Sequence, residues 1–344
     1  MQSEVRSILI VLMGSIGDVV RGLAIVAPIK QAYPSARITW LVEPTCSSLV
    51  REHALLDEVL VFNRKQPLRG LLKLISELRS RHFDVCLDLQ RHFKSGAFSW
   101  LSGARKRIGF HRKDAKELNW IFQTDYIEQA PQDLAKILHY LSFLPALGIT
   151  AGSELRFGLA EKEQSETVKQ LRSTLGPAYV VFVLGSSWQS KDWLLEGYQK
   201  LVEYVLSQSS YRIALCGDQS QITRAAAIMA KQSGDRVIDL VGKTSLVDLA
   251  YILKDASACV GPDSGPAHIA AAVGTPHVTL FGPTSPARVA PFGSENLSLQ
   301  SSLGCTPCYR KKCPGLDRLC MRLLSPEAAW NGLQAALARK SRAV

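Results

Sequence analysis

The sequence predicts an α/β protein with two doubly wound domains facing each other across a cleft. Continuous aliphatic runs such as 8–13 and 179–184 are typical of parallel strands covered on both faces. Segments of helical periodicity alternate with such runs, and the alternation begins again in the second half of the chain. We therefore expect a first Rossmann-like domain over 1–160, a second over 161–325, and a terminal helix over 326–344 that could pack back on the first.

Composition indicates a globular chain with an anionic partner. The 344 residues suffice for two domains, and 47% apolar and 21% charged residues are ordinary proportions. Apolar runs are too short for a membrane span and the N-terminus lacks a secretory segment, so we expect a cytoplasmic protein. The net charge of +11 favours nucleic acid, a membrane face or a phosphorylated substrate. The basic residues lack the interleaved aromatics of nucleic-acid stacking platforms, which disfavours nucleic acid.

The first strand is followed by a glycine-containing turn and a helix predicted over 19–33. The dinucleotide fingerprint is absent, because the turn holds only Gly14 and Gly17, and Asp18 would repel a pyrophosphate. This argues against NAD or FAD. Asp18 instead places a carboxylate where such folds bind ligands, although it could equally be a helix N-cap.

A second strand end in the first domain is basic. The strand predicted over 84–89 leads to Arg91 and Lys94, which lie on the same side as Asp18 if the sheet is parallel. They are candidates for binding an anionic acceptor. Many basic residues between 64 and 116 are expected to form a solvated face, and those over 105–116 could meet phosphates or a negative membrane surface.

The second domain contains the stretch around which we expect a ligand site. A strand over 256–260 is followed by Asp263 and Ser264, either of which can cap the next helix. The helix N-terminus beside Gly265 suits a phosphate or pyrophosphate. Alternatively, this is an ordinary capped βαβ unit, and His268 is a core histidine whose ring is hydrogen-bonded within the protein.

Four of the eight cysteines cluster near the C-terminus, at positions 305, 308, 313 and 320. Four thiols so close can hold zinc or an iron–sulfur cluster, form labile disulfides, or remain unpaired. The spacing is not a standard zinc-ribbon spacing, so these alternatives stay open. The other cysteines are expected in the cores.

Four segments in this order resemble the bacterial glycosyltransferase family 9, the ADP-heptose:lipopolysaccharide heptosyltransferases of GT-B fold. They are M-G-S-I-G-D-V-V near the N-terminus, D-L-Q-R-H-F-K-S at 88–95, S-S-W-Q-S-K-D-W at 186–193, and D-S-G-P-A-H-I-A-A-A with F-G-P-T at 263–284. The resemblance covers nearly the whole chain.

The resemblance implies an inverting, metal-independent transfer of heptose from ADP-heptose to an anionic lipopolysaccharide core of the lipid A–Kdo type. It implies a cytoplasmic enzyme in peripheral contact with the inner membrane, no cofactor, an acceptor-binding first domain and a donor-binding second domain. By this resemblance, Asp18 is the general base that takes the proton from the acceptor hydroxyl. The implied acceptor-binding residues are Gly17, Asp88, Gln90, Arg91 and Lys94. The implied donor-binding residues are Ser186, Ser187, Lys191, Asp239, Asp263, Ser264, Gly265 and His268.

Within this implied donor site, Lys191 would meet the diphosphate, where a cation and a helix dipole replace a metal ion. Asp239 would suit the ribose hydroxyls, with a turn cap as its alternative. Three other functions are the alternatives: another nucleotide-sugar enzyme of GT-B architecture with a different donor or epimerase chemistry, a nucleic-acid-binding protein, and a non-catalytic nucleotide-binding module. Turnover with ADP-heptose separates the first from the heptosyltransferase, and the third predicts that replacing Asp18 leaves activity and ligand affinity unaltered.

Overall fold

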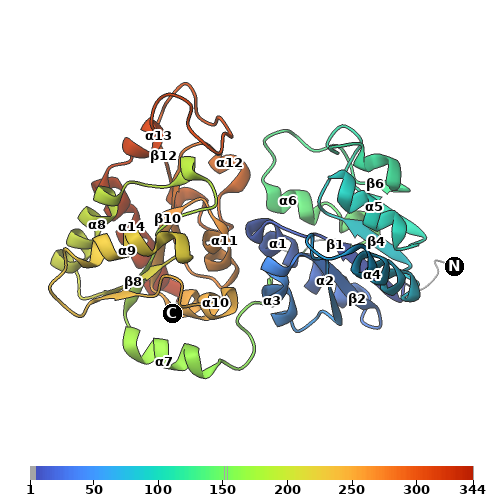
Figure 1. Ribbon diagram of the computed structural model, residues 1–344, viewed down its shortest axis with the longest axis horizontal. Helices are drawn as coiled ribbons and strands as arrows, with labels where there is room; N and C mark the ends of the chain where they lie inside the picture. Colours follow the sequence, from blue (N-terminus) through green and yellow to red (C-terminus); the bar gives the residue numbers. More distant parts are fainter. Residues whose placement is uncertain (1–4, 151, 153, 344) are drawn as a thin grey trace. The chain divides into compact units, whose positions relative to one another are not determined.

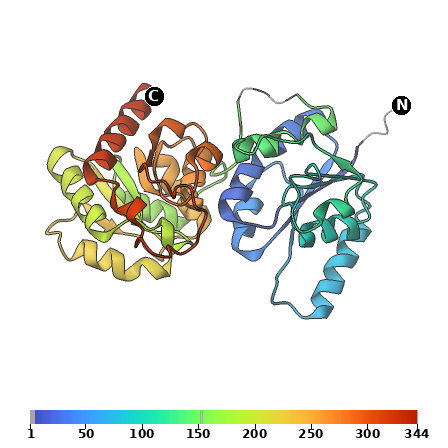
Figure 2. The ribbon, with the colours of Figure 1, turned by 90° about the horizontal axis from the view of Figure 1, so that it is seen from above.

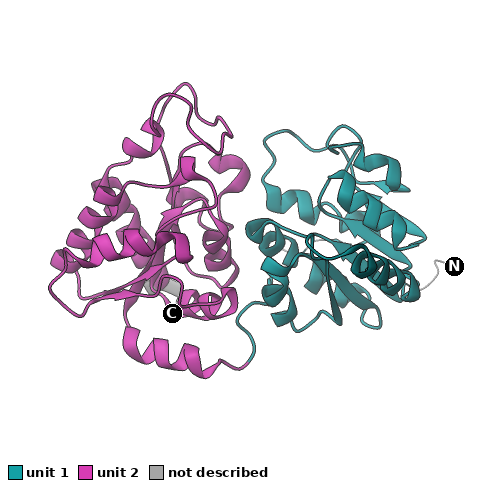
Figure 3. Cartoon of the chain, in the orientation of Figure 1, with its two compact units in different colours: residues 1–162 teal, residues 163–344 magenta. Residues whose placement is uncertain are grey.

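The computed structural model describes residues 5–150, 152 and 154–343. The chain divides into two compact units, the first ending at Lys162 and the second beginning at Glu163 (Figure 3). Residues 1–4, 151, 153 and 344, which the expected domains include, lie outside the described part. Within the described part, no helix is both long and apolar enough to cross a lipid bilayer.

The first unit is built on a six-stranded parallel sheet with the order β3-β2-β1-β4-β5-β6 (Figure 1). Its strands are β1 (Ser7–Val11), β2 (Arg37–Val42), β3 (Glu58–Val61), β4 (Val85–Asp88), β5 (Lys106–Gly109) and β6 (Asp125–Tyr126). The strand order reverses between β1 and β4. Doubly wound proteins bind ligands at this reversal, outside the carboxyl ends of the strands. The reversal brings together the segments that follow β1 and β4.

Helices cover both faces of the first sheet (Figure 2). They are α1 (Ile16–Leu23), α2 (Val26–Ala32), α3 (Pro44–Glu52), α4 (Leu68–Ser80), α5 (Phe93–Leu101) and α6 (Lys136–Leu141), with short 3-10 turns η1 (Asn119–Phe122) and η2 (Pro145–Leu147). Leu74 and Leu78 of α4 and Phe98 of α5 pack with apolar residues of β1 on one face. Helix α1 contacts α3 and α6.

The helix predicted over 19–33 is broken into α1 and α2. The cause is Pro28, which has no N–H to donate to the carbonyl of Ala24 four residues earlier. Instead, the N–H of Ile25 bonds to Gly22 O at 3.2 Å and closes a tight turn. The break shortens the helix that carries Asp18.

The second unit has a six-stranded parallel sheet with the order β12-β11-β10-β7-β8-β9. Its strands are β7 (Tyr179–Val183), β8 (Arg212–Cys216), β9 (Val237–Asp239), β10 (Ala258–Pro262), β11 (His277–Phe281) and β12 (Ser298–Gln300). Its helices are α7 (Glu166–Leu175), α8 (Leu195–Gln208), α9 (Ile222–Met229), α10 (Leu246–Asp255), α11 (Gly265–Ala272), α12 (Pro286–Val289), α13 (Leu319–Arg322) and α14 (Pro326–Ala343), with 3-10 turns η3 (Gln189–Lys191), η4 (Gln219–Gln221) and η5 (Glu295–Leu297). Here the order reverses between β7 and β10. The predicted α/β architecture of two doubly wound sheets is confirmed.

The terminal helix α14 packs on the core of the second unit. Ala329, Trp330 and Leu333 are buried in a core cluster shared with β7, β10 and α8. Trp330 Nε1 also donates to Gln208 Oε1 of α8 at 3.0 Å. Burying a large apolar side chain stabilises a fold by about 1.5–3 kcal/mol, so α14 fixes the back of the second sheet.

Candidate functional site

In the first unit, the Asp18 carboxylate is the centre of a polar cluster. Arg21 Nη2 donates to its Oδ1 at 2.8 Å, and Lys136 Nζ and Tyr140 Oη donate to the same oxygen at 2.9 and 3.0 Å. Oδ2 accepts from the Ser15 hydroxyl at 3.0 Å. Three donors therefore hold Oδ1, and Oδ2 keeps lone pairs for a proton.

Asp18 is not the N-cap of α1. That position belongs to Ser15, and no side chain caps the helix. Burial alone would raise the pKa of Asp18, but the charges of Lys136 and Arg21 and the hydrogen bonds from both hold it well below its usual range. The carboxylate is therefore ionised at neutral pH.

Lys136 and Tyr140 are site residues that the sequence analysis missed. They lie four positions apart on α6, so both project from one face of the helix toward Asp18. Burial lowers the pKa of Lys136, and the Asp18 charge offsets part of that effect. The i, i+4 spacing was visible in the sequence, but nothing in it connects residue 136 to residue 18.

Asp88 is hydrogen-bonded inside the first unit, and its expected contact with an acceptor stays a prediction. Its side chain is fully buried. Its Oδ2 accepts from Asn119 Nδ2 at 2.6 Å, from Gln123 Nε2 at 3.0 Å and from the Ser95 hydroxyl at 3.1 Å. Burial raises the pKa of Asp88, and these bonds counter the rise. Asp88 thus ties the end of β4 to α5 and η1.

Gln90 also acts on the backbone: its Oε1 accepts from the N–H of Met13 at 2.9 Å, and its Nε2 donates to Gly14 O at 3.4 Å. It fixes the turn that carries Asp18. Gly17 is buried in the first turn of α1, beside Asp18.

The two basic candidates differ in their surroundings. Lys94 Nζ pairs with Glu43 Oε1 at 2.7 Å and lies 5.2 Å from the centroid of the Phe62 ring. Arg91 has a positive φ of 68° and stacks 5.1 Å from the Phe110 ring centroid. Its charge is close enough to lower the pKa of Lys136, after the larger effects of burial and Arg21. Arg91 is therefore the basic candidate beside the Asp18 cluster.

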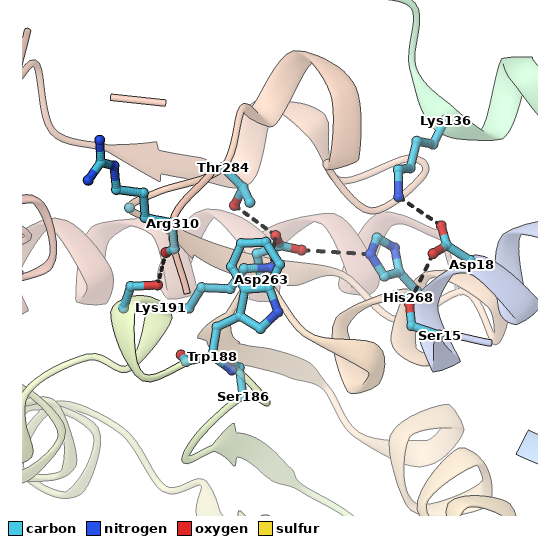
Figure 4. Close-up of polar contacts among 12 residues, drawn as sticks. Ser15, Asp18, Lys136, Ser186, Trp188, Lys191, Asp263, His268, Thr284 and Arg310 are labelled. Carbon is cyan, nitrogen blue, oxygen red and sulfur yellow. Dashed lines mark hydrogen bonds and ion pairs between the residues drawn. The ribbon is translucent and has the colours of Figure 1, made fainter. Parts of the chain in front are cut away.

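In the second unit, Lys191, Asp263 and Thr284 meet at the carboxyl edge of the sheet (Figure 4). Lys191 Nζ donates to Asp263 Oδ2 at 2.7 Å, and the Thr284 hydroxyl donates to the same oxygen at 2.8 Å. His268 Nε2 lies 3.8 Å from Asp263 Oδ1. Lys191 Nζ also lies 4.5 Å from the Trp188 ring centroid, so an aromatic face and a carboxylate orient this ammonium group.

The N-terminus of α11 lies directly after Asp263. Ser264 is the N-cap, and Gly265 and Pro266 form the first turn. The Ser264 hydroxyl makes no capping bond, and its oxygen is buried without a hydrogen-bond partner. A buried polar atom without a partner is costly, and a ligand oxygen at the helix N-terminus would satisfy it.

Other donor candidates lie outside this cluster. The Ser186 hydroxyl donates to Trp188 O at 3.0 Å and accepts from Trp188 N–H, so it shapes its loop, and its expected contact with a diphosphate stays a prediction. Ser187 is exposed on the same loop. Asp239 ends the edge strand β9, where its Oδ1 accepts from the N–H of Val241 at 2.9 Å. Strands β7 and β8 separate β9 from β10, so Asp239 does not join Asp263.

A cavity of about 500 Å³ lies at the carboxyl ends of β7 and β8. Ser186, Gln189 and Asp192 line it from the loop that carries Lys191, and Arg224 lines it from α9. Its volume lies within the usual range for small-molecule pockets. Arg224 is a residue that the sequence analysis did not single out.

Comparisons with known proteins agree with the expected family. Residues 71–317 match the sequence model of glycosyltransferase family 9 (heptosyltransferase). The lipopolysaccharide core heptosyltransferase OpsX of Haemophilus influenzae is 27% identical over 292 residues, covering 84% of this chain and 82% of its own.

Solved structures share the fold. A family 9 glycosyl transferase from Veillonella parvula superimposes with a TM-score of 0.82 at 19% identity, covering 98% of this chain and 99% of its own. The Escherichia coli heptosyltransferase WaaC, solved with ADP, gives 0.77 at 23% identity, covering 96% of this chain and 99% of its own.

Proposed function

Because the chain belongs to glycosyltransferase family 9, the heptosyltransferases, we propose that it transfers heptose from ADP-heptose to an anionic lipopolysaccharide-core acceptor. The donor is inferred from WaaC, which was solved with ADP and with ADP-2-deoxy-2-fluoro heptose. The acceptor class is inferred from OpsX, a lipopolysaccharide core enzyme. The observation that carries the proposal is the Asp18 carboxylate, with Oδ1 held by three donors and Oδ2 available.

In the proposed reaction, Asp18 is the general base. Its Oδ2 takes the proton from an acceptor hydroxyl as that oxygen forms a bond to the anomeric carbon. The bond between the anomeric carbon and the diphosphate oxygen breaks, and ADP leaves with the electron pair. One displacement of this kind inverts the anomeric centre. Arg91 would attract the acceptor's phosphate and carboxylate groups.

The second unit would bind the donor and stabilise the leaving diphosphate. Lys191 uses one of its three N–H donors on Asp263 and keeps others for phosphate oxygens. The Ser264 hydroxyl and the first N–H groups of α11 add donors beside it. Asp263 would orient the sugar hydroxyls, and the cavity beside Arg224 has the size for the nucleoside. In this scheme a lysine and a helix terminus take the role that a metal ion has in other transferases.

A donor screen tests this function. Purified protein is given ADP-heptose or ADP-, GDP- and UDP-hexoses, with heptose-deficient lipopolysaccharide as acceptor, in the presence of EDTA. We expect turnover with ADP-heptose alone, and a loss of about 10²–10⁴-fold in Asp18→Asn with unchanged ADP affinity. Turnover only with another donor would overturn the substrate. A rate that EDTA abolishes and Mg²⁺ restores would overturn the metal-free step, and full activity of Asp18→Asn would overturn the base.

We also infer a peripheral position at the cytoplasmic face of the inner membrane, where this acceptor would be met. A surface formed by α5 and η1 supports it, because Trp100, Leu118 and Ile121 are 53%, 59% and 51% exposed. Arg112 and Lys116 add positive charge nearby in the chain, with the Arg112 guanidinium 3.9 Å from the Trp120 ring centroid. Exposed aromatic and aliphatic side chains with basic neighbours suit an anionic lipid surface.

A further inference from the structure

Four thiols from the segment that joins β12 to α14 line one cavity of the second unit. Cys305, Cys308, Cys313 and Cys320 all line this cavity, whose volume is about 330 Å³. None of them is in a disulfide.

One of these thiols is oriented by the backbone. The N–H groups of Arg318, Gly315 and Leu316 donate to Cys313 Sγ. Metal ions bind the thiolate form of cysteine, and hydrogen bonds to the sulfur orient such ligands.

The segment that carries the cysteines has few other means of support. Residues 301–318 contain neither helix nor strand, and most of their side chains are exposed or half-buried. A segment without an apolar core commonly depends on a cross-link or a metal ion. The segment is also basic, with Arg310, Lys311, Lys312 and Arg318. These charges would offset the negative charge of four thiolates around a divalent ion.

We propose that Cys305, Cys308, Cys313 and Cys320 bind one tetrahedrally coordinated transition-metal ion, zinc or iron, as a structural site. Four thiolate ligands suit these two metals. In the part of the chain that the structure describes, no group of three or more cysteine, histidine or acidic side chains is yet arranged to hold an ion. The thiols therefore close around the ion as it binds, and each releases its proton.

The cysteine segment braces the turns that carry the proposed donor site. The Ser190 hydroxyl donates to Arg310 O at 2.6 Å, and the Ser190 N–H bonds to Lys311 O at 3.2 Å. The N–H of Tyr309 bonds to Pro283 O at 2.7 Å. Ser190 and Pro283 directly precede Lys191 and Thr284, so the bound metal would hold both partners of Asp263 in place. This link rests on the proposed function, whereas the metal site does not.

The test is the metal content of the full chain, purified without chelators and also stripped under reducing conditions and reconstituted with Zn²⁺ or Fe²⁺. We expect about one ion per chain with four thiols protected from a thiol reagent. Changing any one of the four cysteines to serine should weaken metal binding by about tenfold or more. The control is Cys46→Ala, which removes a buried thiol of the first unit and should leave metal content unchanged.

The metal site would be overturned if no ion bound after reconstitution with either metal, or if the serine variants bound metal as tightly as the parent protein. It would also be overturned if the intact mass of metal-free protein showed disulfides, or if acid-labile sulfide indicated a cluster. The bracing role has a separate readout, the calorimetric affinity for ADP, which should fall in Cys308→Ser. Normal ADP affinity in that metal-free variant would show that the metal does not brace the donor site, and the proposed metal site would stand. Normal heptose transfer by a chain that cannot bind metal would likewise remove the bracing role, and it would leave both the metal site and the proposed function.

Discussion

Lys136 Nζ lies 2.9 Å from Asp18 Oδ1, although 118 positions separate the two residues in the chain. The lysine is largely buried, with 29% of its side chain exposed, and the carboxylate has 19% exposed. A partly buried pair of this kind has a stronger mutual effect on pKa than a surface pair. Lys136 therefore positions the proposed base and keeps it ionised.

Lys136→Met should lower kcat by about tenfold or more, because the carboxylate loses one of the donors that orient it. The same change should raise the pKa of Asp18, since Lys136 is the first of the two cations that lower it. The acid limb of the kcat/KM profile should therefore move to higher pH. The measurement is the pH dependence of heptose transfer at saturating and limiting acceptor.

The matched control is Lys30→Met, which removes a lysine that pairs with Asp57 at 3.1 Å elsewhere in the first unit. It should leave both kcat and the acid limb unchanged. If the acid limb of Lys136→Met stays in place and only the protein yield falls, Lys136 has a structural role and does not act on the pKa of Asp18.

Lys191→Met should weaken ADP binding by about 10–100-fold, because a hydrogen bond to a charged group contributes about 1.5–3 kcal/mol. Calorimetric titration with ADP measures this directly. Lys200→Met serves as the control, since Lys200 pairs with Glu203 on the exposed face of α8. Equal ADP affinity in the two variants would contradict the diphosphate role of Lys191.

The sheets could be predicted from the sequence because their strands are continuous apolar runs, buried on both faces. Ile8, Leu9, Ile10 and Val11 of β1 are all 0% exposed. The groups at the reversal points of both sheets could also be placed, since strand ends in such folds lie along one edge. That reasoning led to Asp18 and Asp263, whereas Lys191 was implied by the family resemblance.

What the sequence did not reveal depends on contacts between distant segments. Asp88 ends β4 in the right place for a ligand, but Asn119 and Gln123 turn its carboxylate inward. Neither partner is marked by a motif. The same holds for Lys136 and Tyr140, which lie on a helix of six residues with no signature of its own.

Replacing both Trp100 and Ile121 by serine should reduce binding to anionic vesicles by about tenfold or more, because each side chain would lose apolar contact with lipid. Sedimentation with phosphatidylglycerol vesicles measures the effect, and phosphatidylcholine vesicles show whether charge contributes. The control is Ile222→Ser, an equally exposed isoleucine (52%) on α9 of the second unit. If the wild-type protein does not bind anionic vesicles, this surface is excluded as a membrane contact.

Both units should lose stability in mild acid, because each contains a buried neutral histidine. Burial lowers the pKa of His277 to about 3 and, as the largest cause, that of His53 to about 4. Their side chains are 0% and 2% exposed. In the unfolded chain a histidine titrates near 6.5, so between that pH and the folded pKa the unfolded state binds more protons. Stability is therefore full above about pH 6.5 and falls as the pH drops toward 4 or 3.

At pH 5 each histidine should cost its unit about 2 kcal/mol relative to pH 7.5. Urea denaturation at the two pH values measures the change in the free energy of unfolding. His277→Gln should remove this pH dependence from the second unit, even if the substitution also changes the stability at pH 7.5. His82→Asn is the control, because His82 is exposed at a φ of 49° that asparagine tolerates. An unchanged pH dependence in His277→Gln would show that another group takes up the proton.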